Sequence, residues 1–167
     1  MSLRKRQNPR VLCNLAGIRI ITKCETLRLT AYPDENDPPI WSLGYGHMED
    51  VTPGMTCTVE QAVEWLHTDL GGVEHTLTNW LTPYNLNSNQ FSACCSLTYN
   101  IGVGDFEEST VFAQIKLGDF ASAATAFALW NKVTKKGVKV VSSGLTARRS
   151  LEAQLFLTPL VQVVAQA

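Results

Sequence analysis

Residues 9–24 repeat apolar side chains at intervals of three and four, the spacing that places them on one face of a helix. The positions that carry this pattern are Val11, Leu12, Leu15, Ile18 and Ile21. Asn8 and Pro9 offer a capping residue followed by proline at the first helical position. The pattern therefore predicts a helix over 9–24, with Glu25 in or just after its last turn.

The next segment changes to a period of two, which is typical of strands. Leu27, Leu29 and Ala31 alternate with larger or polar residues, and residues 40–43 resume an extended pattern. The sequence PDENDPP between them favours a turn, because proline fixes φ and Asp and Asn bond to nearby backbone. We expect a small antiparallel sheet that needs the rest of the chain for its stability.

A long helix is predicted from Thr58, where Gln61 completes a capping-box pattern, to about Trp80. Gly71 and Gly72 in its middle indicate a possible bend or break. Its length suits a helix that joins two lobes. Its apolar stripe consists of Val59, Ala62, Val63, Leu66, Leu70, Val73, Leu77 and Trp80.

Further helices are predicted over 90–101, 109–117, 120–130 and 146–157, and residues 133–144 are interpreted as a flexible or hairpin loop. The prediction is an α+β fold, mostly helical, with one small antiparallel sheet near the N-terminus. The 167 residues suit a single domain, 1–167. We expect a small lobe over about 25–58 and a helical lobe over about 81–167, with helix 9–24 packed on it.

Composition narrows the class of protein. Hydrophobic residues make up 45% and charged residues 17%, as in ordinary globular proteins, and the net charge of −1 gives no reason to expect nucleic acid as a partner. The five cysteines are odd in number and lack a C-x-x-C spacing, so neither a metal site nor a disulfide framework is expected. Buried thiols in a reducing cytoplasm are the simpler interpretation, and no cofactor is expected.

The basic start followed by VLCNLAGI could be mistaken for an export signal. Asn14 and Arg19 interrupt the apolar run, and no clear small-residue cleavage site follows. No run approaches the ~20 apolar residues that a membrane span needs. We therefore expect neither an export signal nor membrane insertion.

Two carboxylates nine positions apart, Glu25 and Asp34, are the strongest candidates for chemistry. One lies at a predicted helix end, where the helix dipole favours the protonated acid, and the other lies in the turn. A protonated and an ionised carboxyl group are the minimum for general acid–base cleavage of an acetal. The competing interpretations are a solvated helix-end acid and an ordinary turn aspartate.

The order helix, Glu25, eight residues, Asp34 and then Gly-Tyr-Gly-His resembles the phage-type lysozymes, glycoside hydrolase family 24. The similarity extends over about residues 11–157. It continues through PGMTCTVEQA, QFSACCSLTYNIGVGDFEESTV, GDFASAATAFALWNK and GLTARRSLEAQLFL.

This resemblance implies a lysozyme-like fold and a muramidase that hydrolyses the β-1,4 bond between N-acetylmuramic acid and N-acetylglucosamine. It implies Glu25 as the general acid, Asp34 as the carboxylate that activates water, and Ser42 in place of a family threonine. Seven residues separate Asp34 from Ser42 where the family usually has five. An inverting reaction is favoured, for which the carboxyl groups lie about 6.5–9.5 Å apart.

Three further residues are candidate substrate contacts: Tyr45, whose ring suits a sugar face, His47, and Asn100. Asn100, with Tyr99 beside it at a helix end, resembles the cleft-lining position of the family. Packing is an equal interpretation for Tyr45. For His47 a structural bond to a carboxylate that pins the sheet is the stronger alternative.

Two other features keep open alternatives. Arg148 and Arg149 either orient Glu25 or pair with Glu152, which follows three to four residues later. Cys24 beside Glu25 invites a cysteine-hydrolase interpretation, but the sequence places no histidine with it.

The prediction is an endolysin that acts on bacterial peptidoglycan glycan strands, most simply as a monomer. We expect it to accumulate in the host cytoplasm and to reach the wall in the periplasm through a separately made membrane pore protein. The alternatives are a lytic transglycosylase, which needs no second carboxylate, and a non-catalytic peptidoglycan-binding component of a phage particle.

Overall fold

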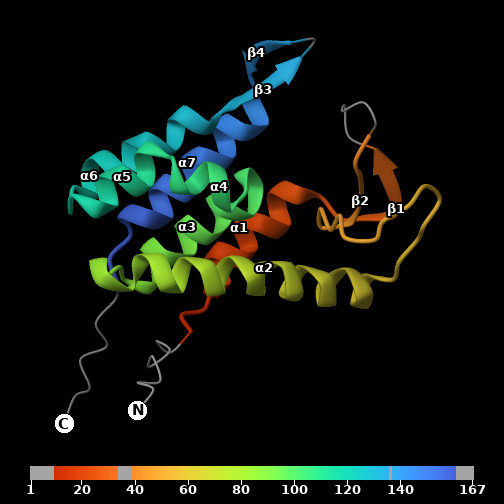
Figure 1. Cartoon of the computed structure of the whole chain (residues 1–167), viewed down its shortest axis with the longest axis horizontal. Helices are drawn as coiled ribbons and strands as arrows, with labels where there is room; N and C mark the ends of the chain where they lie inside the picture. Colours follow the sequence, from red (N-terminus) through yellow and green to blue (C-terminus); the bar gives the residue numbers. More distant parts are fainter. Residues whose placement is uncertain (1–9, 34–38, 136, 161–167) are drawn as a thin grey trace, which may run out of the picture.

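The computed structural model describes residues 10–33, 39–135 and 137–160 (Figure 1). The described chain is mostly helical, with two small antiparallel hairpins, which confirms the predicted α+β class. Its elements in order are α1 (Leu15–Glu25), β1 (Arg28–Pro33), β2 (Trp41–Gly44), α2 (Val59–Leu81), η1 (Thr82–Tyr84), α3 (Ser88–Ile101), α4 (Val103–Glu107), α5 (Thr110–Lys116), α6 (Phe120–Ala126), η2 (Phe127–Trp130), β3 (Lys132–Lys135), β4 (Val138–Val141) and α7 (Ser143–Leu157).

The start of the first helix was predicted wrongly. The Asn14 side chain caps α1 by accepting from the amides of Ala16 and Gly17, so the helix begins at Leu15 instead of residue 9. Residues 10–14 are held by bonds to other helices: the Cys13 amide donates to Glu74 at 2.9 Å. Leu12 and Leu15 are 61% and 70% exposed, so they do not belong to the buried stripe. The predicted cap at residues 8 and 9 lies outside the described residues.

Helix α2 runs without a break from Val59 to Leu81. The Thr58–Gln61 capping box is present, as predicted, but Gly71 and Gly72 do not interrupt the helix. Figure 1 shows α2 extending from the β1–β2 hairpin to the far end of the helical group. It is the long helix expected to link the two lobes.

Other boundaries differ by a few residues. Helix α3 begins two residues early because Asn87 and Gln90 form a capping box, and α7 begins at Ser143, capped by Ser142. The short helix α4 was missed, and the predicted 120–130 helix tightens into 3-10 geometry after Ala126. Residues 132–141 form the β3–β4 hairpin, so the hairpin alternative was the correct one.

The core of the helical lobe surrounds α3. Every residue of α3 from Phe91 to Thr98 is buried, which is the pattern of a helix enclosed by others. Side chains from α1, α2, α5, α6, η2 and α7 complete the core, among them Ile21, Leu66, Leu77, Ile115, Ala123, Phe127 and Phe156. Among the described residues, no helix combines the length and apolar character needed to cross a bilayer.

The β1–β2 hairpin pairs Tyr32 with Ser42 and Pro33 with Trp41. It approaches α2 closely at Gly44, whose φ is +66° and where an added Cβ would lie 3.1 Å from the Cβ of Ala62. Glycine is required there both for the left-handed backbone and for the contact. The small sheet is therefore fixed to the long helix.

Candidate active site

Glu25 is the last residue of α1, as the helical pattern predicts. Thr26 follows with φ 51° and ψ 108°, and this turn redirects the chain into β1 two residues later. A positive φ is rare for a β-branched residue, so the backbone next to Glu25 is strained. Strain of this kind often lies beside functional groups, which agrees with the hypothesis that Glu25 is one.

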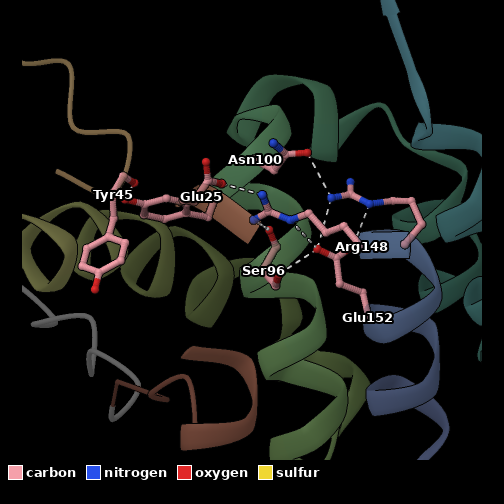
Figure 2. Close-up of polar contacts among 8 residues, drawn as sticks. Glu25, Tyr45, Ser96, Asn100, Arg148 and Glu152 are labelled. Carbon is pink, nitrogen blue, oxygen red and sulfur yellow. Dashed lines mark hydrogen bonds and ion pairs between the residues drawn. The ribbon is translucent and has the colours of Figure 1, made fainter. Parts of the chain in front are cut away.

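The Glu25 carboxylate is bound on one side by Arg148 of α7. The Arg148 Nη1 donates to Glu25 Oε1, and the two side chains are 3% and 19% exposed. The residues are 123 positions apart in the sequence. Figure 2 shows Glu25 between Tyr45 and Arg148.

Arg148 is itself held in place from the other side (Figure 2). Its Nε donates to Glu152 Oε1 at 3.1 Å, and its Nη2 donates to the Ser96 carbonyl oxygen at 3.1 Å. Burial would lower the pKa of Arg148, but the carboxylates of Glu25 and Glu152 outweigh this and raise its pKa. Arg148 is therefore a fixed cation directed at Glu25.

Glu152 is fully buried and anchors this network. It accepts from Ser96 Oγ at 2.7 Å and pairs with Arg149 Nε at 2.9 Å. Burial raises the pKa of the Glu152 carboxyl, and Arg149, Ser96 and Arg148 act in the opposite direction. Both sequence interpretations of the arginines hold at once, because Arg148 contacts Glu25 as well as Glu152.

The network extends to Asn100, whose Oδ1 accepts from Arg149 Nη2 at 3.0 Å. Asn100 is exposed at the end of α3. A hollow of about 690 Å³ lies beside it; its lining includes Lys23, Glu25, Asn100, Val133, Leu145 and Arg148. The end of α1, the start of α7 and strand β3 all line this hollow. Its volume is large enough for a ligand of several rings.

The Gly44–His47 turn forms the other side of the site. An added Cβ on Gly46, whose φ is +90°, would lie 3.6 Å from Glu25 Oε2. Arg148 therefore binds one carboxylate oxygen, and the other faces a backbone that only glycine permits. Tyr45 is half-buried, and its carbonyl oxygen accepts from the Tyr99 hydroxyl at 3.0 Å.

His47 makes the carboxylate contact expected of a structural residue. Its Nδ1 lies 2.9 Å from Asp69 Oδ2 on α2. Its ring stacks on Trp65 with centroids 4.8 Å apart and an interplanar angle of 8°. His47 is buried and joins the turn to α2.

Ser42, one of the predicted catalytic residues, lies in β2. It is 9% exposed and lies opposite Tyr32 in the register. Asp34 lies outside the described residues; it follows Pro33, the last residue of β1, in the sequence. Among the residues that the structure describes, no group of three or more His, Cys, Asp or Glu side chains could hold a metal ion.

Sequence reasoning missed Ser96 as a member of this site, and it considered Tyr99 only together with Asn100 as a candidate sugar contact. Both lie on α3 among apolar residues, and their contacts are to residues 54 and 56 positions away along the chain. The spacing of Ser96 and Tyr99, one helical turn apart, was the only local signal.

The chain matches known proteins over most of its length. The sequence model of the family described as phage lysozyme matches residues 22–152. The endolysin of Acyrthosiphon pisum secondary endosymbiont phage 1 is 36% identical over 140 residues, which cover 84% of this chain and 94% of that protein.

Two solved structures have the same fold. The muramidase domain of SpmX from Asticaccaulis excentricus superposes with a TM-score of 0.82 at 33% identity, covering 90% of this chain and all of that one. The endolysin from Escherichia coli O157:H7 phage FAHEc1 gives 0.79 at 35% identity, covering 89% and 95%.

The fold and the matched sequence define a glycoside hydrolase of the lysozyme class. The chain belongs to the phage lysozyme family.

Proposed function

We propose that this protein is an endolysin muramidase that hydrolyses the β-1,4 bond between N-acetylmuramic acid and N-acetylglucosamine, with Glu25 as the general acid. The observation that carries the proposal is the fixed orientation of Glu25. Arg148 binds Oε1, Oε2 lies near Gly46 of the Gly44–His47 turn, and Glu25 lines the hollow. A general acid needs one oxygen for the leaving group, and in this proposal Oε2 has that role.

Asp34 completes the mechanism as the base. The proton of Glu25 passes to the glycosidic oxygen, and Asp34 takes a proton from the water that attacks the anomeric carbon from the opposite face. Ser42, in the strand that pairs with the end of β1, holds that water through its hydroxyl. The reaction inverts the anomeric configuration, because a water must fit between the carboxyl group and the sugar.

The substrate contacts follow from the position of the turn and of α3. Asn100 is exposed beside the hollow, and Arg149 holds its amide oxygen. This contact leaves the amide NH₂ as a donor to sugar or acetamido oxygens. Tyr45 lies on the side of Glu25 away from Arg148 (Figure 2), where its ring is a further candidate sugar contact, and His47 contributes by fixing the turn.

The biological setting follows from the endolysin relatives. We infer that the protein accumulates in the host bacterial cytoplasm as a monomer and depends on a separately made pore protein to reach the wall. The substrate is the glycan strand of peptidoglycan. Expression with and without a pore-forming protein tests the route, and lysis without the pore would contradict it.

Mass spectrometry of digested, purified peptidoglycan tests the chemistry. Hydrolysis adds water and leaves reducing muramic acid ends, which borohydride converts to muramitol. Anhydro-muramic ends would instead identify a lytic transglycosylase and overturn the hydrolase assignment.

The Asp34→Ala variant gives a second test of mechanism. We expect it to lose activity by about 10²-fold or more, because water activation is lost. Full activity would contradict the two-carboxylate mechanism. Wild-type protein that fails to reduce the turbidity of permeabilised Gram-negative cells would support a binding component without catalysis.

A further inference from the structure

The Tyr99 hydroxyl links α3 to the Gly44–His47 turn, beside Glu25, through a hydrogen bond. It donates to the carbonyl oxygen of Tyr45 at 3.0 Å. Tyr99 packs against the apolar core and is half-buried on α3, one turn after the fully buried Ser96. Its ring position is therefore set by the helical lobe, whereas its acceptor belongs to the small lobe.

The acceptor lies between two glycines whose backbone is left-handed. Gly44 and Gly46 have φ values of +66° and +90°. The turn is closed by a pair of bonds in which the Leu43 and His47 amides donate to each other's carbonyl oxygens, both at 2.9 Å. Glycines give the unfolded and opened turn many conformations, so a turn of this composition needs outside contacts to stay in one.

The turn lies close to the Glu25 carboxyl. Gly46 comes close enough to Glu25 Oε2 that an added Cβ would lie 3.6 Å away. Arg148 fixes the opposite oxygen, and Arg148 in turn bonds to the Ser96 carbonyl of α3. Helix α3 thus holds both sides of Glu25, through Ser96 on one side and through Tyr99 on the other.

We propose that Tyr99 is a positioning residue for catalysis: its hydroxyl locks the Gly44–His47 turn against Glu25 and so fixes the oxygen that donates the proton. This inference rests on the proposed role of Glu25. Tyr99 contacts neither the substrate nor the reacting atoms in this role. The Tyr99 phenol is protonated at neutral pH, as any ordinary tyrosine is, and burial raises its pKa further.

The test is the Tyr99→Phe variant, which removes the hydroxyl and keeps the ring. We expect kcat on soluble, dye-labelled muramyl glycan fragments to fall by about fivefold to tenfold, the size of one hydrogen bond's net contribution, with KM within about twofold. Amide hydrogen exchange at Leu43 and His47 should become faster, since the turn opens more often. Tyr84→Phe is the matched control, because Tyr84 packs edge-on against Phe112 in the core.

Each outcome decides the matter, with rates measured well below the melting temperature of every variant. Lower kcat with faster turn exchange in Tyr99→Phe, and neither change in Tyr84→Phe, supports the proposal. Unchanged kcat overturns it, whether or not exchange becomes faster. Lower kcat with unchanged exchange at the turn also overturns it, because the effect then does not pass through the turn.

Failure of the underlying function is distinguishable. Glu25→Gln, assayed beside the tyrosine variants, should be inactive. Activity in that variant would overturn the role of Glu25 itself, whereas an inactive Glu25→Gln with a fully active Tyr99→Phe would overturn the role of Tyr99 alone.

Discussion

At the scale of one residue, Thr26 carries backbone strain directly beside the proposed general acid. It has φ 51°, a region that β-branched residues avoid, and it directly follows Glu25. Its side chain is exposed, so little packing offsets the strain. The conformation is what allows α1 to end at Glu25 and β1 to begin at Arg28.

Replacing Thr26 with glycine should relieve this strain. We expect Thr26→Gly to raise the free energy of unfolding by about 1 kcal/mol, the strain removed less the added entropy of glycine. Urea denaturation measures it. Thr30→Gly, at an exposed position within β1, is the control and should lower stability. A loss of stability in Thr26→Gly would contradict the strain.

The buried thiol of Cys94 should make the folded state less stable at alkaline pH. Burial raises the pKa of the Cys94 thiol far above its ordinary value of 9.0, and the Glu152 carboxylate adds to the shift. Below pH 9.0 the thiol is protonated in the folded and unfolded states alike. Above it the unfolded chain loses the proton and the folded chain keeps it, so stability falls as pH rises.

In the Cys94→Ala variant, unfolding at alkaline pH should no longer release the proton of this thiol. Its free energy of unfolding should fall less steeply between about pH 9 and 11 than that of the wild type, by about 1.4 kcal/mol per pH unit at most. Val111→Ala, which truncates a buried side chain without a titrating group, should lower stability at every pH and keep the wild-type slope. Equal slopes in Cys94→Ala and wild type would contradict the assignment.

Residue-scale chemistry was predictable only where it had a local signature. Glu25 could be proposed as the acid because it ends an apolar helical pattern and precedes a glycine-rich turn. The contact with Arg148 could not be derived, because no local pattern reports a pair separated by 123 positions. The GLTARR motif gave both interpretations of the arginines but could not show that they coexist.

At the scale of elements, patterns located the helices better than their ends. The apolar period begins at residue 11, before the true start of α1 at Leu15. The helix starts later than the pattern because the amides of Cys13 and Asn14 bond to Glu74 and Ser92, on other helices. Helix α2 was predicted correctly from its capping box and stripe. Its two glycines were read as a possible break, but packing of Leu66, Leu70 and Leu77 into the core outweighs their weak propensity.

The two glycines of α2 should respond differently to alanine. An added Cβ at Gly72 meets nothing within 4 Å, so Gly72→Ala should raise the free energy of unfolding by about 1 kcal/mol. At Gly71 the Cβ would lie 2.7 Å from Arg10 Nη2, and Arg10 pairs with Glu74. Gly71→Ala should therefore gain less. Thermal unfolding of both variants measures the difference, and an equal gain would contradict the contact.

At the scale of the molecule, the small sheet is held to the helical lobe by side chains that converge on its turn. His47 bonds to Asp69 and stacks on Trp65, both on α2, and Tyr99 bonds to the same turn from α3. The arrangement in two parts joined by a long helix could be predicted from the order of elements. The contacts between the parts could not, since they join residues far apart in the sequence.

Breaking one of these contacts should loosen the whole molecule. Asp69→Ala leaves the buried His47 ring without its carboxylate partner, and we expect a loss of about 1–3 kcal/mol in unfolding free energy. Glu64→Ala, at an exposed position of the same helix, should change stability little. Similar losses in the two variants would show that the His47–Asp69 contact does not stabilise the fold.

The central claim is that Glu25 is the proton donor, and the most direct test is the initial rate of reducing-end release from purified peptidoglycan. Glu25→Gln keeps the shape of the side chain and its contact with Arg148 but cannot supply the acid. Glu64→Gln changes the same group at an exposed position of α2. We predict a rate at least about 10²-fold below wild type for Glu25→Gln and a wild-type rate for Glu64→Gln. A folded Glu25→Gln variant that releases reducing ends at the wild-type rate would contradict the account.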